Sequence, residues 1–216
     1  MDYAQKIFAD DPQINLLPCD GIVNYFGRIL SAARALELYQ ALLDTICWKH
    51  DEAIIRGRHI SVARQVAWYG DADYAYTYSG ITKHALMWNS ELREIKTLVE
   101  QMTGTRFNSC LLNLYRTGDE GMTWHSDDEY ALGTDTTIAS VSLGAERKFS
   151  MKHKRMLHAT SIHLEHGSLL VMRGTTQTHW LHCVPKSKRI ISPRINLTFR
   201  TIHMPGTSAG VNLKLA

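Results

Sequence analysis

Residues 107–115, with the sequence FNSCLLNLY, open the series of short apolar segments that decides the fold. Further segments of this kind follow along the second half of the chain, and turn residues such as Gly118, Gly144 and Gly167 separate them. They are TTIASVSL at 136–143, RKFSMK at 147–152, ATSIHL at 159–164, SLLVM at 168–172 and RINLTFRTI at 194–202. Many short strands divided by turns are typical of a β-sandwich or jelly roll.

The first half of the chain has a different pattern. In SAARALELYQALLD at residues 31–44, and again between residues 89 and 102, apolar side chains recur at steps of three and four. This spacing predicts two amphipathic helices, and Gly104 is expected to end the second one. Two strands are expected nearby, at 56–68 and 74–78.

Together these patterns predict an α+β protein in which N-terminal helices precede a jelly-roll core. At 216 residues the chain is expected to form one integrated domain. Residues 1–105 would supply the helices, and residues 106–216 would supply the β-rich core.

Composition indicates an ordinary globular protein, with 44% hydrophobic and 21% charged residues and a formal net charge of +3. No apolar run approaches the roughly 18 residues that a transmembrane helix needs, so we expect no membrane partner. The four cysteines are scattered and form no C-x-x-C pair, which favours reduced thiols. Reduced thiols favour the cytoplasm of a bacterium or the nucleus of a eukaryote. We also expect the protein to be a monomer.

The run WHSDDE at residues 124–129 contains a candidate metal site. On a strand, His125 and Asp127 would point to the same face because they are two positions apart. Either His179 or His182 could be the third ligand, and the spacing does not decide between them. Two histidines and one carboxylate leave coordination positions open for a co-substrate and oxygen, which favours oxidation chemistry. The alternative is a solvated polar turn.

The segment RINLTFR at residues 194–200 predicts a second ligand site. Arg194, Asn196, Thr198 and Arg200 would share one face of a strand, and inward-facing arginines are costly unless they are paired. A dicarboxylate would pair both, since each guanidinium offers a bidentate fork. Pairing with Asp or Glu side chains is the alternative. On the strand at 107–115, Asn113 and Tyr115 could add hydrogen bonds.

Two surface patterns are compatible with a nucleic-acid ligand. Tyr74, Tyr76 and Tyr78 would share a strand face, which either packs in the core or binds a flat ligand. Basic residues cluster at 147–155 and at 186–189, where they either track phosphates or form a solvated surface.

These motifs resemble those of the AlkB family of Fe(II)/2-oxoglutarate-dependent dioxygenases. The similar segments are NLY at 113–115, HSDDE at 125–129, ASVSLG at 139–144, His182 and RINLTFR at 194–200. Upstream, RQVAWYGD at 64–71 and YTYSG at 76–80 are similar to the substrate-side segment of the subgroup that repairs alkylated DNA. The resemblance implies a double-stranded β-helix, or jelly-roll, core with an N-terminal nucleotide-recognition lid.

The resemblance also implies roles for individual residues. Iron would be held by His125, Asp127 and His182. The residues implied to bind 2-oxoglutarate are Asn113, Tyr115, Arg194, Asn196 and Arg200, with Arg194 at the distal carboxylate. The residues implied to contact the substrate are Tyr76, Tyr78, Glu129, Arg64, Gln65, Arg147, Lys152 and Lys154, with Tyr78 and His125 on either side of a flipped base.

The implied activity is oxidative demethylation of N-alkylated bases in DNA, such as 1-methyladenine and 3-methylcytosine. It would use Fe(II), 2-oxoglutarate and O2 and release formaldehyde, succinate and carbon dioxide. A methyl group on a Watson–Crick nitrogen is unreachable inside a duplex, so the base must be flipped out or already single-stranded. The alternatives are an RNA demethylase, an oxygenase acting on a non-nucleic substrate, and a metal-binding jelly roll without turnover.

Overall fold

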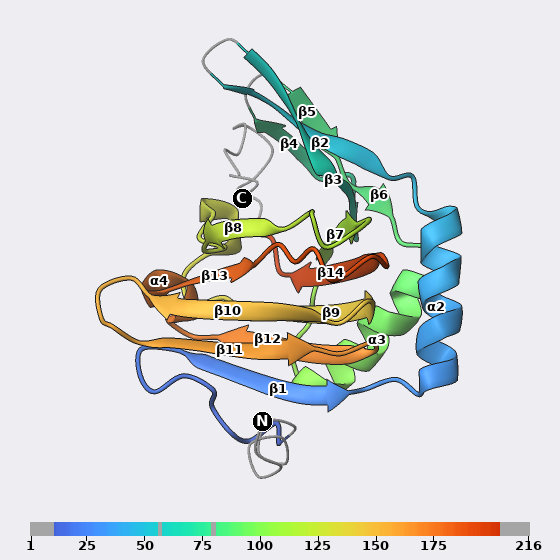
Figure 1. Ribbon diagram of the computed structural model, residues 1–216. Helices are drawn as coiled ribbons and strands as arrows, with labels where there is room; N and C mark the ends of the chain where they lie inside the picture. Colours follow the sequence, from blue (N-terminus) through green and yellow to red (C-terminus); the bar gives the residue numbers. More distant parts are fainter. Residues whose placement is uncertain (1–10, 56–57, 79–80, 204–216) are drawn as a thin grey trace.

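Two facing β-sheets and two helices make up most of the molecule (Figure 1). The structure, a computed structural model, describes residues 11–55, 58–78 and 81–203; at 51, 53–55, 58–61, 76–78, 81 and 82 it describes the backbone alone. The larger sheet has eight strands in the order β1-β12-β9-β14-β7-β3-β2, with β6 paired to β3. The smaller sheet has the order β11-β10-β13-β8, and β4 pairs with β5 separately.

The strands of the larger sheet come from both halves of the chain. They are β1 (Ile22–Arg28), β2 (Lys49–Ile55), β3 (Arg58–Gly70), β6 (Leu86–Met87), β7 (Ser109–Tyr115), β9 (Ile138–Gly144), β12 (Ser168–Arg173) and β14 (Arg194–Arg200). The remaining strands are β4 (Ala75–Tyr78), β5 (Ile81–His84), β8 (Met122–His125), β10 (Arg147–His153), β11 (Ala159–Leu164) and β13 (Trp180–Val184). The division of the chain near residue 105 stays a prediction.

Both expected helices are confirmed. Helix α2 (Ala32–Thr45) begins after Ser31, whose side chain accepts a hydrogen bond from the N–H of Arg34. Helix α3 (Ser90–Thr103) begins after Asn89 and ends at Gly104, which has the left-handed φ of 67° that glycine tolerates best. The helices pack on one face of the larger sheet, where Leu38, Leu42, Leu92, Ile95 and Val99 form a core with β7, β9 and β14.

The second core lies between the two sheets. Tyr25 and Leu170 of the larger sheet meet Phe149, Met151 and Trp180 of the smaller one. A fully buried side chain of this size contributes roughly 1.5–3 kcal/mol through the hydrophobic effect. This packing of two sheets around an apolar interior confirms the jelly-roll core.

The order of elements differs from the expectation in one respect. The helices do not come first, because β1 precedes α2 and pairs antiparallel with β12. The strands β1, β2, β5, β6, β8 and β13 were not anticipated from the sequence. Two of them, β8 and β13, are only four and five residues long, and the burial of β8 does not alternate. Within the described residues, no helix combines the length and apolarity needed to cross a bilayer.

A short 3-10 helix and a single-turn helix lie close to the candidate site. The 3-10 helix η1 (Tyr130–Leu132) follows β8, and helix α4 (Thr176–His179) leads directly into β13. Both lie where β8 ends and β13 begins in the smaller sheet (Figure 1).

Candidate active site

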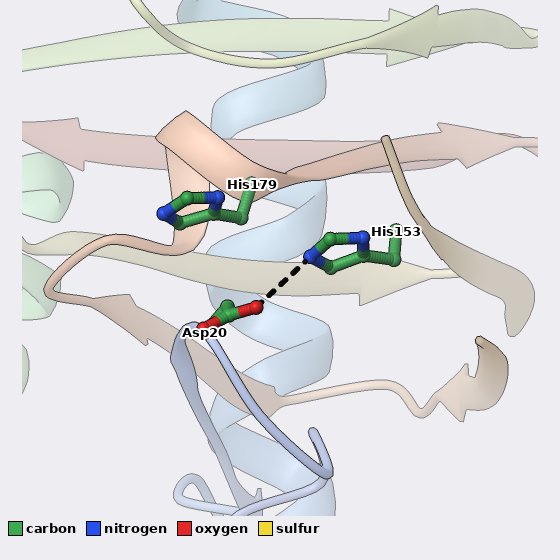
Figure 2. A group of neighbouring side chains, drawn as sticks. All are labelled: Asp20, His153 and His179. Atoms are coloured by element: carbon green, nitrogen blue, oxygen red, sulfur yellow. Dashed lines mark ion pairs between the residues drawn. The ribbon is translucent and has the colours of Figure 1, made fainter. Parts of the chain in front are cut away.

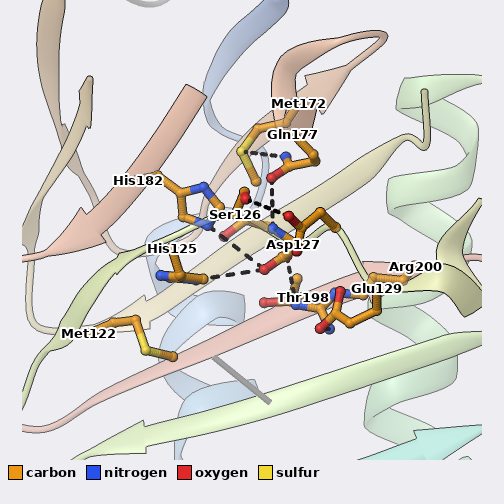
Figure 3. Close-up of polar contacts among 12 residues, drawn as sticks. Met122, His125, Ser126, Asp127, Glu129, Met172, Gln177, His182, Thr198 and Arg200 are labelled. Atoms are coloured by element: carbon orange, nitrogen blue, oxygen red, sulfur yellow. Dashed lines mark hydrogen bonds and ion pairs between the residues drawn. The ribbon is translucent and has the colours of Figure 1, made fainter. Parts of the chain in front are cut away.

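His125, Asp127 and His182 converge on one point (Figure 3). His125 is the last residue of β8, and His182 lies opposite it on the neighbouring strand β13. The Nε2 atoms of His125 and His182 are 3.6 Å and 3.9 Å from Oδ1 of Asp127. These are the separations of three ligand atoms around one cation, so the three predicted metal ligands are brought together.

Asp127 reaches this point in a way that the sequence did not suggest. The strand β8 ends at His125, so the two residues do not share the face of one strand. Asp127 lies in the following loop, where its backbone N–H donates to Oε1 of Gln177 at 2.9 Å. Gln177 was not anticipated, because it lies in α4, far along the chain from Asp127.

The protonation states suit a metal ion. Nδ1 of His125 donates to the Thr123 carbonyl at 2.8 Å, which leaves the Nε2 lone pair facing the site. Burial lowers the pKa of His182 to about 3, so this ring is neutral at physiological pH. Burial opposes ionisation of Asp127, but the charge of Arg200 and its hydrogen bond to the carboxylate outweigh it, and the pKa of the carboxyl lies below its usual range. Two neutral imidazoles and one carboxylate form the facial ligand set typical of non-haem Fe(II).

Arg200 and Glu129 complete the polar surroundings of Asp127. Nη2 of Arg200 donates to Oδ2 of Asp127 at 2.6 Å, and Nη1 of Arg200 lies 3.9 Å from Oε1 of Glu129. Burial raises the pKa of Glu129 to about 7. One of the two arginines therefore pairs with acidic side chains, which is the alternative considered from the sequence.

Arg194, at the other end of β14, lacks such a partner. It is 1% exposed, and its Nη2 donates to Oγ of Ser142 at 2.9 Å. Its Nε and Nη1 have no hydrogen-bond partner among the described residues, and neither does Oδ1 of Asn113. Burial lowers the pKa of Arg194 to about 10, so the group is still a cation at neutral pH. A buried cation with two unused donors fits a carboxylate ligand.

Tyr115 and Asn196 lie next to this cation. The Tyr115 ring centroid is 5.4 Å from the Arg194 guanidinium carbon. Nδ2 of Asn196 donates to Oγ of Ser140 at 2.8 Å, and its Oδ1 accepts from the Thr198 hydroxyl at 3.1 Å. The expected inward face of β14 is therefore present, and it leads from Arg194 towards the metal ligands.

The residues expected to contact a nucleic acid differ in how deeply they are buried. Arg147 is 1% exposed and donates to the carbonyls of Thr117, Glu120 and Pro185, so it lies behind Tyr115 and not on the surface. This corrects its expected place in a phosphate-binding rim. Lys152 is half-buried, with its ammonium 4.5 Å from the centre of the Trp124 ring.

The other expected substrate residues are also engaged within the protein. Arg64 is buried, and its Nη1 donates to the sulfur of Met122 at 2.9 Å. Gln65 accepts from Arg116, and Lys154 donates to the Gln177 carbonyl at 2.8 Å. The side chains of Tyr76 and Tyr78, on β4, lie outside the described part of the structure. All their contacts to a substrate stay predictions.

His179, the alternative third ligand, belongs to a second cluster with Asp20 and His153 (Figure 2). Nε2 of His153 is 3.3 Å from Oδ2 of Asp20, and the rings of His153 and His179 stack. Nδ1 of His153 accepts hydrogen bonds from the N–H groups of Arg155 and Met156. The proton of the neutral ring is therefore on Nε2, the atom nearest Asp20, and a cation would have to displace it. The cluster is best described as a contact that holds the loop before β1 against β10.

Comparison with known proteins agrees with this geometry. The model of the 2OG-Fe(II) oxygenase superfamily matches residues 22–200. The chain is 42% identical to human DNA oxidative demethylase ALKBH2 over 203 residues, which covers 88% of this chain and 77% of that protein. The chain belongs to the AlkB family of 2OG-Fe(II) oxygenases. This family implies Fe(II), 2-oxoglutarate and O2, and the buried ligand set and the cation Arg194 fit them.

A second sequence relative and one solved structure show how much of each chain the similarity covers. Human alpha-ketoglutarate-dependent dioxygenase alkB homolog 3 is 40% identical over 176 residues, which is 77% of this AlkB-family chain but only 61% of that relative. The solved structure of OsALKBH1 superposes with a TM-score of 0.62 at 16% identity, covering 87% of this chain and 99% of that one. At that identity the match bears on the fold alone.

Proposed function

We propose that this chain is an oxidative demethylase that repairs N-alkylated bases in DNA, with 1-methyladenine and 3-methylcytosine as substrates. It would act as a monomer in the compartment that holds the DNA, the cytoplasm of a bacterium or the nucleus of a eukaryote. The observation that carries the proposal is the convergence of His125, Asp127 and His182 in a jelly roll that also holds a buried cation, Arg194, with unused donors. The names of the similar proteins support nucleic acid as the substrate class.

Fe(II) and 2-oxoglutarate would bind to different groups of residues in the site. His125, Asp127 and His182 would hold Fe(II), and Arg194 would bind the distal carboxylate of 2-oxoglutarate with help from Tyr115 and Asn196. Arg200 and Asn113 would lie against the carboxylate that binds near the metal. When bound, these cofactors supply the oxidising power that hydroxylates an N-methyl group, after which the product releases formaldehyde.

The protein's own residues would select and hold the base. Tyr78 and His125 would stack on its two faces, and Glu129 would contact its exocyclic amino group. A base methylated at N1 of adenine or N3 of cytosine is a cation and pairs poorly, so it is extruded at a lower cost than a normal base. Aromatic faces attract such a cation by about 0.5–2 kcal/mol. This attraction would favour the lesion over an unmodified base.

Release of succinate and formaldehyde tests the proposal. The protein would be incubated with iron, ascorbate, 2-oxoglutarate and a DNA oligonucleotide containing 1-methyladenine, beside the same oligonucleotide with adenine. We expect one formaldehyde for each methyl group removed, and none from the unmodified strand. Formaldehyde release that is equal for both strands would contradict base demethylation.

The same assay separates the alternatives. An RNA oligonucleotide of identical sequence would be the better substrate if the chain is an RNA demethylase. A non-nucleic oxygenase would consume 2-oxoglutarate without demethylating either strand. A binding module without turnover would retain metal and 2-oxoglutarate and form no succinate.

A further inference from the structure

Gln177 connects the metal ligand Asp127 to a different part of the chain. It lies in α4, is 6% exposed, and accepts the Asp127 N–H through Oε1 at 2.9 Å (Figure 3). Asp127 itself lies beyond the end of β8, so no strand pairing fixes its backbone. The hydrogen bond to Gln177 therefore replaces the restraint that a β-ladder would otherwise provide.

Gln177 is itself held at two further points. Its Nε2 donates to the sulfur of Met172 at 3.4 Å, and its backbone carbonyl accepts from Nζ of Lys154 at 2.8 Å. The backbone N–H of Lys154 also donates to the carbonyl of His179, at the end of the same helical turn. Lys154 thus ties α4 to the hairpin between β10 and β11.

The carboxylate of Asp127 is restrained from the opposite side. Nη2 of Arg200 donates a hydrogen bond to Oδ2, while Oδ1 faces the Nε2 atoms of His125 and His182. With the carboxylate held by Arg200 and the backbone held by Gln177, the position of Oδ1 is defined. Loss of the Gln177 contact would remove the hydrogen bond that ties the backbone of Asp127 to α4, and Arg200 would still hold its carboxylate.

We propose that Gln177 is a positioning residue of the metal centre and that Lys154 acts on the centre through Gln177. The inference rests on the proposed function only in taking His125, Asp127 and His182 as the metal ligands. Groups that orient metal ligands typically contribute about 10- to 100-fold in metal affinity. We expect Gln177 to lie at the lower end of this range, because it orients the backbone of Asp127 and not its carboxylate.

Cobalt(II) binding tests the inference without any turnover. Gln177→Met keeps the length of the side chain and removes the strong acceptor for the Asp127 N–H. We expect the dissociation constant for Co(II), read from its visible absorption, to rise about tenfold. The melting temperature of the metal-free protein should fall by about 2–4 °C for each kcal/mol that the lost hydrogen bond contributed. Gln101→Met makes the same chemical change at an exposed site on α3 and should leave the Co(II) dissociation constant unaltered.

Lys154→Met keeps the inference testable if Gln177→Met folds poorly, because Lys154 lies at the surface. We expect it to weaken Co(II) binding by a few fold, and to have no further effect once Gln177 is already Met. Additive effects of the two substitutions would show that Lys154 does not act through Gln177. Unchanged Co(II) affinity in stable Gln177→Met would refute the inference. If Asp127→Asn also leaves Co(II) binding unchanged, the ligand set and with it the proposed function fail instead.

Discussion

The guanidinium of Arg194 lies over the ring of Tyr115, with 5.4 Å between its Cζ and the ring centroid. This contact orients a buried cation whose Nε and Nη1 have no partner among the described residues. Arg147 lies 5.5 Å from the same ring and donates to three backbone carbonyls. Two guanidinium groups thus contact the ring of Tyr115, and the Nε and Nη1 donors of Arg194 are unused.

Replacing Arg194 tests whether this cation binds 2-oxoglutarate. Hydrogen bonds to a charged group are worth roughly 1.5–3 kcal/mol, so Arg194→Gln should raise the KM for 2-oxoglutarate by about 10- to 100-fold. The KM for the oligonucleotide should change little. Steady-state kinetics with each substrate varied in turn measures both. Arg93→Gln, at an exposed position on α3, is the matched control. An unchanged KM for 2-oxoglutarate would mean that the co-substrate binds elsewhere.

Asp127→Asn tests the ligand set. The amide keeps the size of the side chain and removes the negative charge, so bound iron should fall from one per chain to a small fraction of that value. Metal analysis after gel filtration gives the content directly. Asp135→Asn, on an exposed turn, makes the same change elsewhere and should retain iron. Full iron content in Asp127→Asn would remove Asp127 from the ligands.

Replacing Glu100 tests a buried ion-pair contact between α3 and the segment that follows it, away from the candidate active site. Its carboxylate accepts from the Phe107 N–H at 2.8 Å and pairs with Lys96 and Arg106. Burial opposes ionisation, but these partners outweigh it and hold the pKa of Glu100 below its ordinary value. We expect Glu100→Gln to lower the free energy of unfolding by about 1–3 kcal/mol at pH 7, as measured by urea denaturation.

The pH dependence of this contribution has a definite sign. A carboxyl whose pKa is depressed in the folded state stabilises the protein fully above its unfolded pKa of about 4.3. The contribution is lost as the pH falls through the depressed folded value. The difference in stability between the parent protein and Glu100→Gln should therefore be constant near neutrality and shrink in acid. A difference that grows below pH 4 would contradict this account.

Replacing Lys152 tests whether this side chain contacts the phosphate backbone of a nucleic acid. Its ammonium lies over the exposed ring of Trp124 on β8, next to the metal ligand His125 in the chain. Lys152→Met should weaken oligonucleotide binding and reduce the slope of log K against log salt by about one. Fluorescence anisotropy at several salt concentrations gives the slope. Lys49→Met, at an exposed position on β2, should leave it unchanged. An unaltered slope in Lys152→Met would mean that no phosphate lies near it.

Local patterns in the sequence were sufficient for much of the fold. The period of the apolar residues gave α2 and α3, and Gly104 marked the end of α3. The alternation of Arg194, Asn196, Thr198 and Arg200 gave the polar face of β14, because side chains two apart on a strand share a face.

Features that depend on distant partners were not predictable in this way. The strand β13 pairs with β8 and β10, and its five residues show no alternation of their own. His179 and His182 looked equivalent as ligands, but α4 ends at His179 and β13 carries His182, so the two rings enter different clusters. Arg147 was predicted to be a surface charge because it lies in a basic cluster of the sequence. The three backbone carbonyls that accept its hydrogen bonds belong to residues distant in the chain, so the local sequence does not indicate them.

Mass spectrometry of a DNA oligonucleotide containing one 1-methyladenine tests the proposed repair activity most directly. The strand would be incubated with the iron-loaded protein, ascorbate and oxygen, with and without 2-oxoglutarate. The proposed function predicts that the strand loses the mass of one methyl substituent only when 2-oxoglutarate is present, and that Asp127→Asn abolishes the loss. A strand of unchanged mass, with iron and 2-oxoglutarate both shown to be bound, would contradict it.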